Sequence, residues 1–112
     1  MANLSLNFYK FEQYLIDIEH DCILGYTGIH YIFKFPNGYG ASVVKSFGSQ
    51  GYIDDLWELC TILYTDEHKF EFTPSRYELI YPYEISGPFS GPTGNLTEVD
   101  ILRLLDKIYK FA

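Results

Sequence analysis

The sequence predicts an α+β domain, in which an antiparallel meander of four to five strands is flanked by an N-terminal and a C-terminal helix. Runs rich in β-branched and aromatic residues alternate with turn-forming residues through the middle of the chain, and apolar residues recur at helical spacing at both ends. A chain of 112 residues with 47% hydrophobic residues has enough material for one core and is not typical of a disordered protein. We therefore expect residues 1–112 to form a single domain.

The first expected element is a helix that ends near Gly25. Ser5 or Asn7 can cap its start, and most acidic residues of the segment lie off its apolar stripe. The high content of β-branched and aromatic residues keeps a strand in this segment as the alternative. The apolar stripe consists of Phe8, Phe11, Leu15, Ile18 and Cys22.

The strongest local signal is a β-hairpin centred on Asn37 and Gly38. These residues separate the β-prone runs 29–35 and 39–45, and an Asn-Gly pair favours a type I′ turn because both central residues need positive φ. Pro36 has no N–H group to donate to the ladder, which favours a longer loop.

The rest of the sheet is expected from three further runs. Residues 56–64 are rich in apolar, β-branched and aromatic side chains and predict a buried strand, with a helix capped by Asp54 as the alternative. Shorter strands are expected at 69–72 and 77–81. The 86–94 segment is dense in Gly, Pro and Ser and predicts a loop.

The C-terminal helix has the clearer start signal of the two. Thr97 is suited to cap it, and Asp100 three positions later gives a capping-box arrangement. Lys107 and Lys110 lie in the last turns, where positive charge suits the helix dipole. The expected apolar face consists of Leu96, Val99, Leu102, Leu105 and Ile108.

The chain is acidic, with 8 Lys and Arg against 15 Asp and Glu and a formal net charge of −7. Phosphate binding needs clustered Lys and Arg, so direct nucleic-acid binding is disfavoured. An acidic surface instead suits a partner with a basic surface. The N-terminus does not have the pattern of a signal peptide, and no apolar stretch approaches the ~18 residues that span a bilayer. We expect a cytoplasmic protein without membrane contact.

No cofactor or metal site is expected, because His20, His30 and His68 lack the spacing of metal ligands. Cys22 and Cys60 are expected to be reduced, and burial of Cys60 inside an apolar strand is expected to raise the pKa of its thiol. No catalytic residue is therefore assigned. A small hydrolase or ligand-binding domain, with a pocket between sheet and helices, remains an alternative function.

Aromatic and acidic side chains on the surface are the remaining candidates for function. Tyr and Trp provide large contact areas at low entropic cost and are frequent hot spots of interfaces. The loop at 81–94 is the segment where an exposed aromatic residue is most expected. The candidate interface residues are Asp54, Asp55, Trp57, Glu58, Tyr81, Tyr83 and Phe89.

Two motifs carry a resemblance. Residues 35–45 read FPNGYGASVVK, and residues 56–59, which follow Gly51, read LWEL. They resemble a group of small uncharacterised proteins of tailed bacteriophages that share an NGYGxSVV hairpin, a glycine loop and an LWEL strand. The Thr-Glu-led terminal helix of that group corresponds to residues 96–99 and the helix after them, whereas residues 1–25 and the later loop depart from its pattern.

The resemblance implies a phage accessory protein and carries no catalytic residue. Together with the small size, negative charge and aromatic content, it leads us to expect a non-enzymatic protein that binds and inhibits a host protein in the bacterial cytoplasm, in host takeover or against host defence. The alternative is a structural or self-associating module of the phage, which would form a homo-oligomer through a sheet edge.

Overall fold

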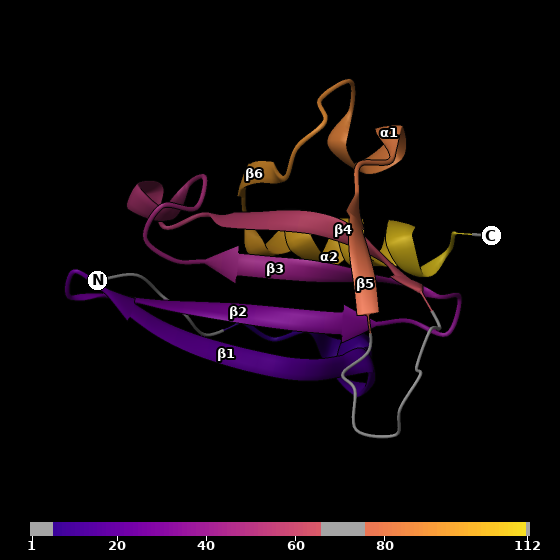
Figure 1. Ribbon diagram of the computed structural model, residues 1–112, viewed down its shortest axis with the longest axis horizontal. Coiled ribbons are helices and arrows are strands. Elements are labelled where there is room, and N and C mark those ends of the chain that lie inside the picture. Colours follow the sequence, from indigo (N-terminus) through magenta and orange to yellow (C-terminus); the bar gives the residue numbers. More distant parts are fainter. Residues whose placement is uncertain (1–5, 66–75, 112) are drawn as a thin grey trace.

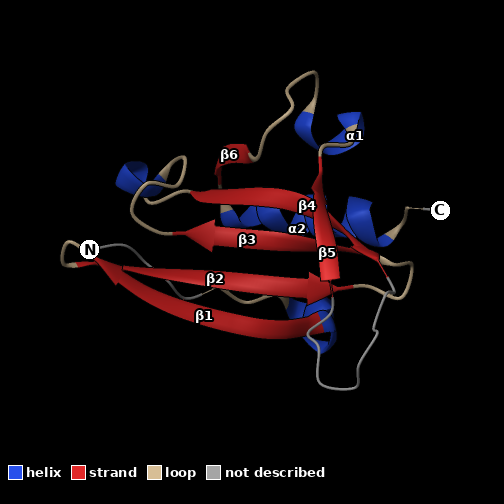
Figure 2. Cartoon of the chain, in the orientation of Figure 1, coloured by secondary structure: helices blue, strands red, loops and turns tan. Residues whose placement is uncertain are grey.

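The computed structural model of the protein describes residues 6–65 and 76–111. Figure 2 colours the elements in these residues by type. In chain order they are the 3-10 helix η1 (Tyr9–Tyr14), β1 (Leu15–Ile23), β2 (Tyr26–Lys34), β3 (Tyr39–Lys45), the 3-10 helix η2 (Tyr52–Asp54), β4 (Trp57–Thr65), β5 (Arg76–Ile80), α1 (Tyr83–Ser86), β6 (Thr93–Leu96) and α2 (Glu98–Tyr109).

The strands form one antiparallel sheet in the order β1-β2-β3-β4-β5, as expected for the α+β meander. β5 pairs with residues 61–65 of β4, and β6 pairs with the start of β4 at Trp57 and Leu59. Figure 1 shows α2 behind β3 and β4, while β5 crosses in front of them. The helix thus covers one face of the sheet.

The N-terminal segment is a short 3-10 helix followed by a strand. The prediction of a helix that ends near Gly25 is therefore wrong, and the strand alternative holds for residues 15–23. Residues 15–23 pair with β2, which satisfies their backbone groups in a ladder, and their β-branched side chains suit a strand. Leu24 and Gly25 form the turn from β1 to β2, with φ angles of 52° and 81°. Two successive positive φ angles are typical of a type I′ hairpin turn.

The hairpin at Asn37 and Gly38 is confirmed, but its turn is not of type I′. Residues 35–38 connect β2 to β3, and Gly38 alone among them has positive φ, at 88°. Asn37 instead turns its side chain toward the end of α2. Its Nδ2 donates to the carbonyl oxygens of Ile108, Tyr109 and Phe111 at 2.9, 3.1 and 3.1 Å, which ties the β2–β3 connection to the C-terminal end of α2.

The helix α2 begins at the predicted capping box. The Thr97 hydroxyl accepts from the Asp100 N–H at 3.2 Å, and the Asp100 carboxylate accepts from the Thr97 N–H at 3.0 Å. These hydrogen bonds, foremost that from the Thr97 backbone, lower the pKa of Asp100. Among the described residues no helix is long and apolar enough to cross a membrane.

The main core lies between α2 and the sheet, and the predicted apolar face of α2 is partly wrong. Leu105 and Ile108 are buried as expected, but Val99 is 74% exposed and Leu96 belongs to β6. Val99 lies on the solvent-exposed side of α2, so the buried stripe begins two positions later, at Ile101. The core comprises Ile101, Leu104, Leu105 and Ile108 of α2, together with Tyr31, Phe33, Val43, Trp57 and Leu59 of the sheet.

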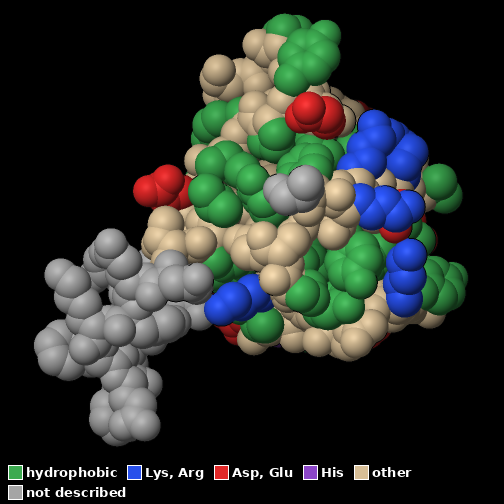
Figure 3. All heavy atoms as spheres, turned by 90° about the vertical axis from the view of Figure 1, so that its right-hand side faces the viewer, with side chains coloured by type: hydrophobic (Ala, Val, Ile, Leu, Met, Phe, Trp, Pro, Cys, Tyr) green, Lys and Arg blue, Asp and Glu red, His purple; other side chains and the backbone are tan. Residues whose placement is uncertain are grey.

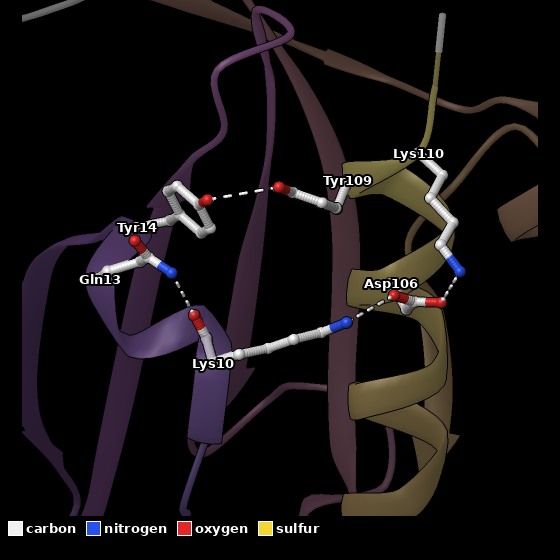
Figure 4. Close-up of polar contacts among 6 residues, drawn as sticks. All are labelled: Lys10, Gln13, Tyr14, Asp106, Tyr109 and Lys110. Carbon is white, nitrogen blue, oxygen red and sulfur yellow. Dashed lines mark hydrogen bonds and ion pairs between the residues drawn. The ribbon is translucent and has the colours of Figure 1, made fainter.

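The helix η1 closes the same face of the sheet beside α2. Phe8, which precedes η1, packs edge-on against Tyr31 and Phe33, with ring centroids 4.7 and 4.8 Å apart. Figure 4 shows the polar contacts that join η1 to α2. Asp106 of α2 accepts from Lys10 Nζ at 3.2 Å and from Lys110 Nζ at 2.8 Å, and a hydrogen bond also joins the Tyr14 and Tyr109 hydroxyls, whose oxygens are 3.4 Å apart.

The opposite face of the sheet holds a second, smaller cluster built around Tyr64. The Tyr64 ring crosses β3 at Gly40, and its hydroxyl donates to the Phe33 carbonyl oxygen at 3.0 Å. A Cβ atom on Gly40 would collide with that carbonyl oxygen and lie 2.9 Å from Tyr64 Cε2. Burial raises the pKa of Tyr64 to about 12. Glycine at this position is what allows the ring to lie flat across the strand.

The other expected elements are largely present. The strands predicted at 56–64 and 77–81 are β4 and β5, and the predicted strand at 69–72 lies outside the described residues. The 86–94 segment is a loop for most of its length. The sequence reasoning missed α1 before this loop and β6, which begins inside it at Thr93.

Candidate functional site

One end of the sheet carries an open pocket lined by aromatic side chains. The β1–β2 turn, the start of β2 and the loop that contains η2 lie together at this end, at the left of Figure 1. The pocket has a volume of about 780 Å³. We call it the aromatic pocket, and it is lined by Gly25, Tyr26, Thr27, Phe47, Tyr52, Ile53 and Asp55.

Three rings form the wall of the aromatic pocket. Tyr26 stacks on Phe47 with ring centroids 5.0 Å apart and planes inclined by 17°, and it meets Tyr52 edge-on at 6.2 Å. The Tyr52 hydroxyl donates to the Thr27 carbonyl oxygen at 2.8 Å, which ties η2 to β2. Each such ring pair contributes about 0.5–1.5 kcal/mol of stabilisation beyond the burial of its surface area. The three rings therefore support one another in the absence of a bound partner.

The apolar side chains at this end are strongly exposed. Ile53 is 95% exposed, Leu24 80% and Tyr26 51%, while Phe47 is 39% exposed. Scattered apolar side chains are normal on a surface, but a group of large ones around a pocket is typical of an interaction site.

Backbone contacts hold the loop that forms one side of the pocket. The Ser49 N–H donates to the Ser46 carbonyl oxygen at 2.9 Å, and the Leu56 N–H donates to the Gly51 carbonyl oxygen at 2.9 Å. Gly51 has φ of 91°, and a Cβ atom there would lie 2.9 Å from Leu56 Cβ. The glycine therefore allows both the turn and the close return of the chain to β4.

An ion pair between a buried lysine and a half-exposed aspartate fastens the same loop to the sheet. Lys45 at the end of β3 is 2% exposed, and its Nζ lies 2.9 Å from Asp55 Oδ1 and 4.5 Å from the centre of the Trp57 ring. Asp55 has φ of 61°, a left-handed conformation that Asp tolerates better than most residues. Because Asp55 also lines the aromatic pocket, this ion pair sets the position of the pocket wall.

Most charges around the aromatic pocket are negative. The segments that form this end, residues 20–28 and 46–58, contain Asp21, Asp54, Asp55 and Glu58, and Lys45, which precedes the second segment, pairs with Asp55. Figure 3 views the other end of the molecule and shows Lys and Arg side chains gathered there. The exposed aromatic group thus lies at the acidic end of the protein.

Three of the interface residues predicted from the sequence lie at this end. Asp54 and Asp55 are exposed, and Asp55 takes part in the ion pair described above. Glu58 is half-buried and accepts a hydrogen bond from the Gln50 N–H at 2.6 Å. Glu58 therefore has a structural contact within the loop, while Asp54 presents its carboxylate to solvent.

Trp57 is not a surface residue, and its prediction as an interface anchor is wrong. The side chain is 1% exposed and packs against Tyr31, with ring centroids 6.0 Å apart. Trp57 begins β4 on the face covered by α2, where a large ring fills the core. Its sequence neighbours in the LWEL motif do not reveal which face of the strand it occupies.

Tyr81, Tyr83 and Phe89 are exposed, as expected, but they lie away from the aromatic pocket. They are 40%, 74% and 75% exposed and belong to α1 and its flanking segments, at the top of Figure 1. Phe89 lines a separate depression of about 500 Å³ together with Gln50 and the 86–94 loop. The loop around Gln50 therefore separates the two groups.

Sequence reasoning missed Phe47, Ile53 and Leu24 as candidates for the interface. Two of them carry a signal in the sequence: Leu24 precedes the glycine of a turn, and Phe47 precedes another glycine just after a strand. Apolar residues at turn positions cannot be buried by their own strands, so they are exposed unless another element covers them.

A polar chain of Glu19, His30 and Ser42 crosses three neighbouring strands on the face opposite α2. His30 Nδ1 lies 3.6 Å from Glu19 Oε2, and His30 Nε2 is hydrogen-bonded to Ser42 Oγ. This order of groups can draw a proton from a serine hydroxyl. Acyl transfer also needs N–H donors for an oxyanion, and β3 pairs with strands on both sides, so its N–H groups belong to the ladders. Among the described residues, β3 therefore offers no free N–H group beside Ser42.

The two cysteines differ in their surroundings. Burial raises the pKa of the Cys60 thiol to about 11, as the apolar strand around it predicted, so the thiolate is scarce at neutral pH. Cys22 is exposed on β1, and both cysteines are free thiols. Within the described ranges, no group of three or more His, Cys, Asp or Glu side chains is arranged to hold a metal ion.

Comparison with known proteins finds no match: no family model, no curated protein and no solved structure is similar to this chain.

Proposed function

We propose that the protein is a non-enzymatic binding domain that recognises a partner protein through the aromatic pocket. The observation that carries this proposal is the group of exposed large apolar side chains, with Ile53 at 95% exposure, around a pocket whose rings are already packed together. A preformed pocket of this kind reduces the ordering cost of binding.

The proposed partner has a basic surface beside an apolar side chain. An apolar group would fill the pocket, while Asp54 and the other carboxylates at this end would attract Lys and Arg around it. The resemblance to phage proteins extends the proposal to a host protein as the partner and to inhibition as the outcome. Occupation of a basic surface on a nuclease or polymerase would have that effect, because such surfaces bind nucleic acid.

The test is capture of a partner from bacterial lysate with the tagged protein, at low and at moderate salt. Ile53→Ser and Tyr26→Ala remove exposed contact area and leave the core intact, so each should reduce capture at least tenfold. Tyr83→Ala is the matched control, since Tyr83 is 74% exposed but lies away from the pocket. Loss of capture with Tyr83→Ala, and not with the pocket variants, would contradict the assignment of the site.

Light scattering on the same samples tests the alternative. A stable homo-oligomer that the pocket variants convert to monomers would show that the pocket serves self-association and would overturn the proposal of a heterologous partner.

A further inference from the structure

The strand β1 lies at an edge of the sheet. Within residues 6–65 and 76–111 it pairs with β2 on one side, and no strand pairs with its other side. A bulge interrupts the ladder between Leu15 and Asp17, and the register is regular from Asp17 to Ile23. An edge of this length offers a row of N–H and C=O groups that natural proteins usually protect.

The two faces of this edge differ sharply in character. Asp17, Glu19 and Asp21 share one face, because alternate residues of a strand point to the same side, and all three are exposed. The other face presents Ile18, which is 46% exposed, followed along the strand by the exposed His20 and Cys22. The edge thus offers carboxylates on one face and an apolar group on the other.

The row of carboxylates disfavours pairing with a second copy of the chain. A two-fold antiparallel pairing that joins two sheets keeps residues of the same face opposite each other. Centred on Glu19, it would place Asp17 opposite Asp21 of the second copy and Glu19 opposite itself. Other centres within this run also set carboxylates against carboxylates, and directly opposed like charges are destabilising.

We propose that β1 accepts an extended segment of the partner protein as an additional strand, with Lys or Arg at alternate positions beside the carboxylates and apolar residues between them beside Ile18. This inference rests on the proposed function, and it adds the class of segment that is recognised. Main-chain hydrogen bonds would supply affinity, and the alternation of charge would set the register.

A defined probe tests this proposal without the natural partner. The probe is a seven-residue peptide of alternating Lys and Val, acetylated and amidated at its ends, titrated into the protein while hydrogen exchange of the β1 amides is followed. We expect saturable binding and slower exchange in residues 17–23. Absence of both would overturn the proposal.

Backbone methylation separates strand addition from simple charge attraction. A strand added to one edge uses the N–H groups of alternate residues only. N-methylation of one alternate set should therefore weaken binding at least tenfold, and methylation of the other set should leave it within about twofold. Equal binding of the two methylated peptides would show that charge alone attracts the probe, and would refute strand addition.

Charge reversal on the protein provides the second test. Asp17→Lys, Glu19→Lys and Asp21→Lys together should weaken binding of the Lys-Val peptide roughly tenfold, from three cross-strand charge pairs. The matched control reverses Glu78, Glu84 and Glu98, which are exposed and lie elsewhere, with the same change in net charge. Equal losses in the two variants would contradict the assignment to β1.

Failure of this inference is distinguishable from failure of the proposed function. If partner capture depends on Ile53 and Tyr26 while the peptide does not bind β1, the pocket function stands and the edge proposal falls.

Discussion

The ion pair between Lys45 and Asp55 provides the sharpest test of how the aromatic pocket is held. The informative change is Asp55→Asn, because Asn keeps the shape of the side chain and tolerates the left-handed backbone at φ of 61°. In this variant the Lys45 side chain, which is 2% exposed, loses the carboxylate that lies 2.9 Å from its Nζ atom. The free energy of unfolding should therefore fall.

The magnitude follows from the geometry. Attraction between unit charges 2.9 Å apart is about 6 kcal/mol at an effective dielectric constant of 20 and about 1.4 kcal/mol in bulk water. The Asp55 side chain is 51% exposed, so water screens the pair and the lower part of this range applies. We expect Asp55→Asn to cost about 2 kcal/mol, below the 3–5 kcal/mol typical of fully buried pairs.

A double-mutant cycle isolates the interaction energy between Lys45 and Asp55. Lys45→Met removes the buried charge and keeps an apolar stem over Trp57, so it should change stability by less than about 1 kcal/mol. In that background Asp55→Asn should cost at least about 1 kcal/mol less than it does in the parent chain. The assay is urea unfolding followed by fluorescence of Trp57, the single Trp of the chain. Additive effects of the two changes, within about 0.5 kcal/mol, would refute the argument.

Three further predictions test other parts of the structure. Gly40→Ala should lower stability by about 2 kcal/mol, because its Cβ would collide with the carbonyl oxygen and ring beside it, whereas Gly91→Ala, with nothing within 4 Å of its Cβ, should be nearly neutral in thermal unfolding. At pH 8, iodoacetamide should label Cys22 quickly and Cys60 only after unfolding, since burial raises the pKa of the Cys60 thiol to about 11; equal labelling of the folded protein would contradict this. The pKa of Asp100 is lowered below its usual 3.8, so its ionised form stabilises the fold above that pH, and this contribution is lost as the pH falls through the folded-state pKa. Asp100→Asn should flatten that acid dependence in a circular-dichroism titration, and an unchanged slope would count against the capping role.

The features that the sequence predicted well are those fixed by neighbouring residues. Gly38 marks a turn because its φ of 88° favours glycine, and Thr97 with Asp100 marks a helix start because each side chain satisfies the other's backbone N–H. These signals depend on three or four consecutive positions, so no knowledge of distant contacts is needed.

The features that it missed depend on distant contacts. Ile18 recurs at helical spacing with its neighbours, yet it lies in a strand because β2 supplies a partner along the whole segment. Ile101 rather than Val99 is buried because the docking angle of α2 decides which residues of its first turn meet the sheet. The local spacing of apolar residues predicts neither the pairing of β1 with β2 nor the docking angle of α2.

The aromatic pocket was missed for a related reason. Tyr26 begins β2 and Phe47 follows β3, and the antiparallel pairing of these strands brings the two rings into contact. The sequence shows a Tyr and a Phe beside glycines, but only the register beyond the hairpin shows that they stack. Trp57 gave the opposite error, since its size suggested an anchor and its face of β4 made it part of the core.

The contacts of Asn37 with the end of α2 have a consequence for synthesis of the chain. The hairpin leaves the ribosome long before Ile108, Tyr109 and Phe111, whose carbonyl oxygens its side chain binds. Until α2 has emerged, Phe33, Val43 and the other core side chains beneath it are exposed to solvent. The nascent sheet then presents an apolar face that is prone to aggregation. Such a chain is a natural client for chaperones at the tunnel exit, and it gains its protection from aggregation in one late step.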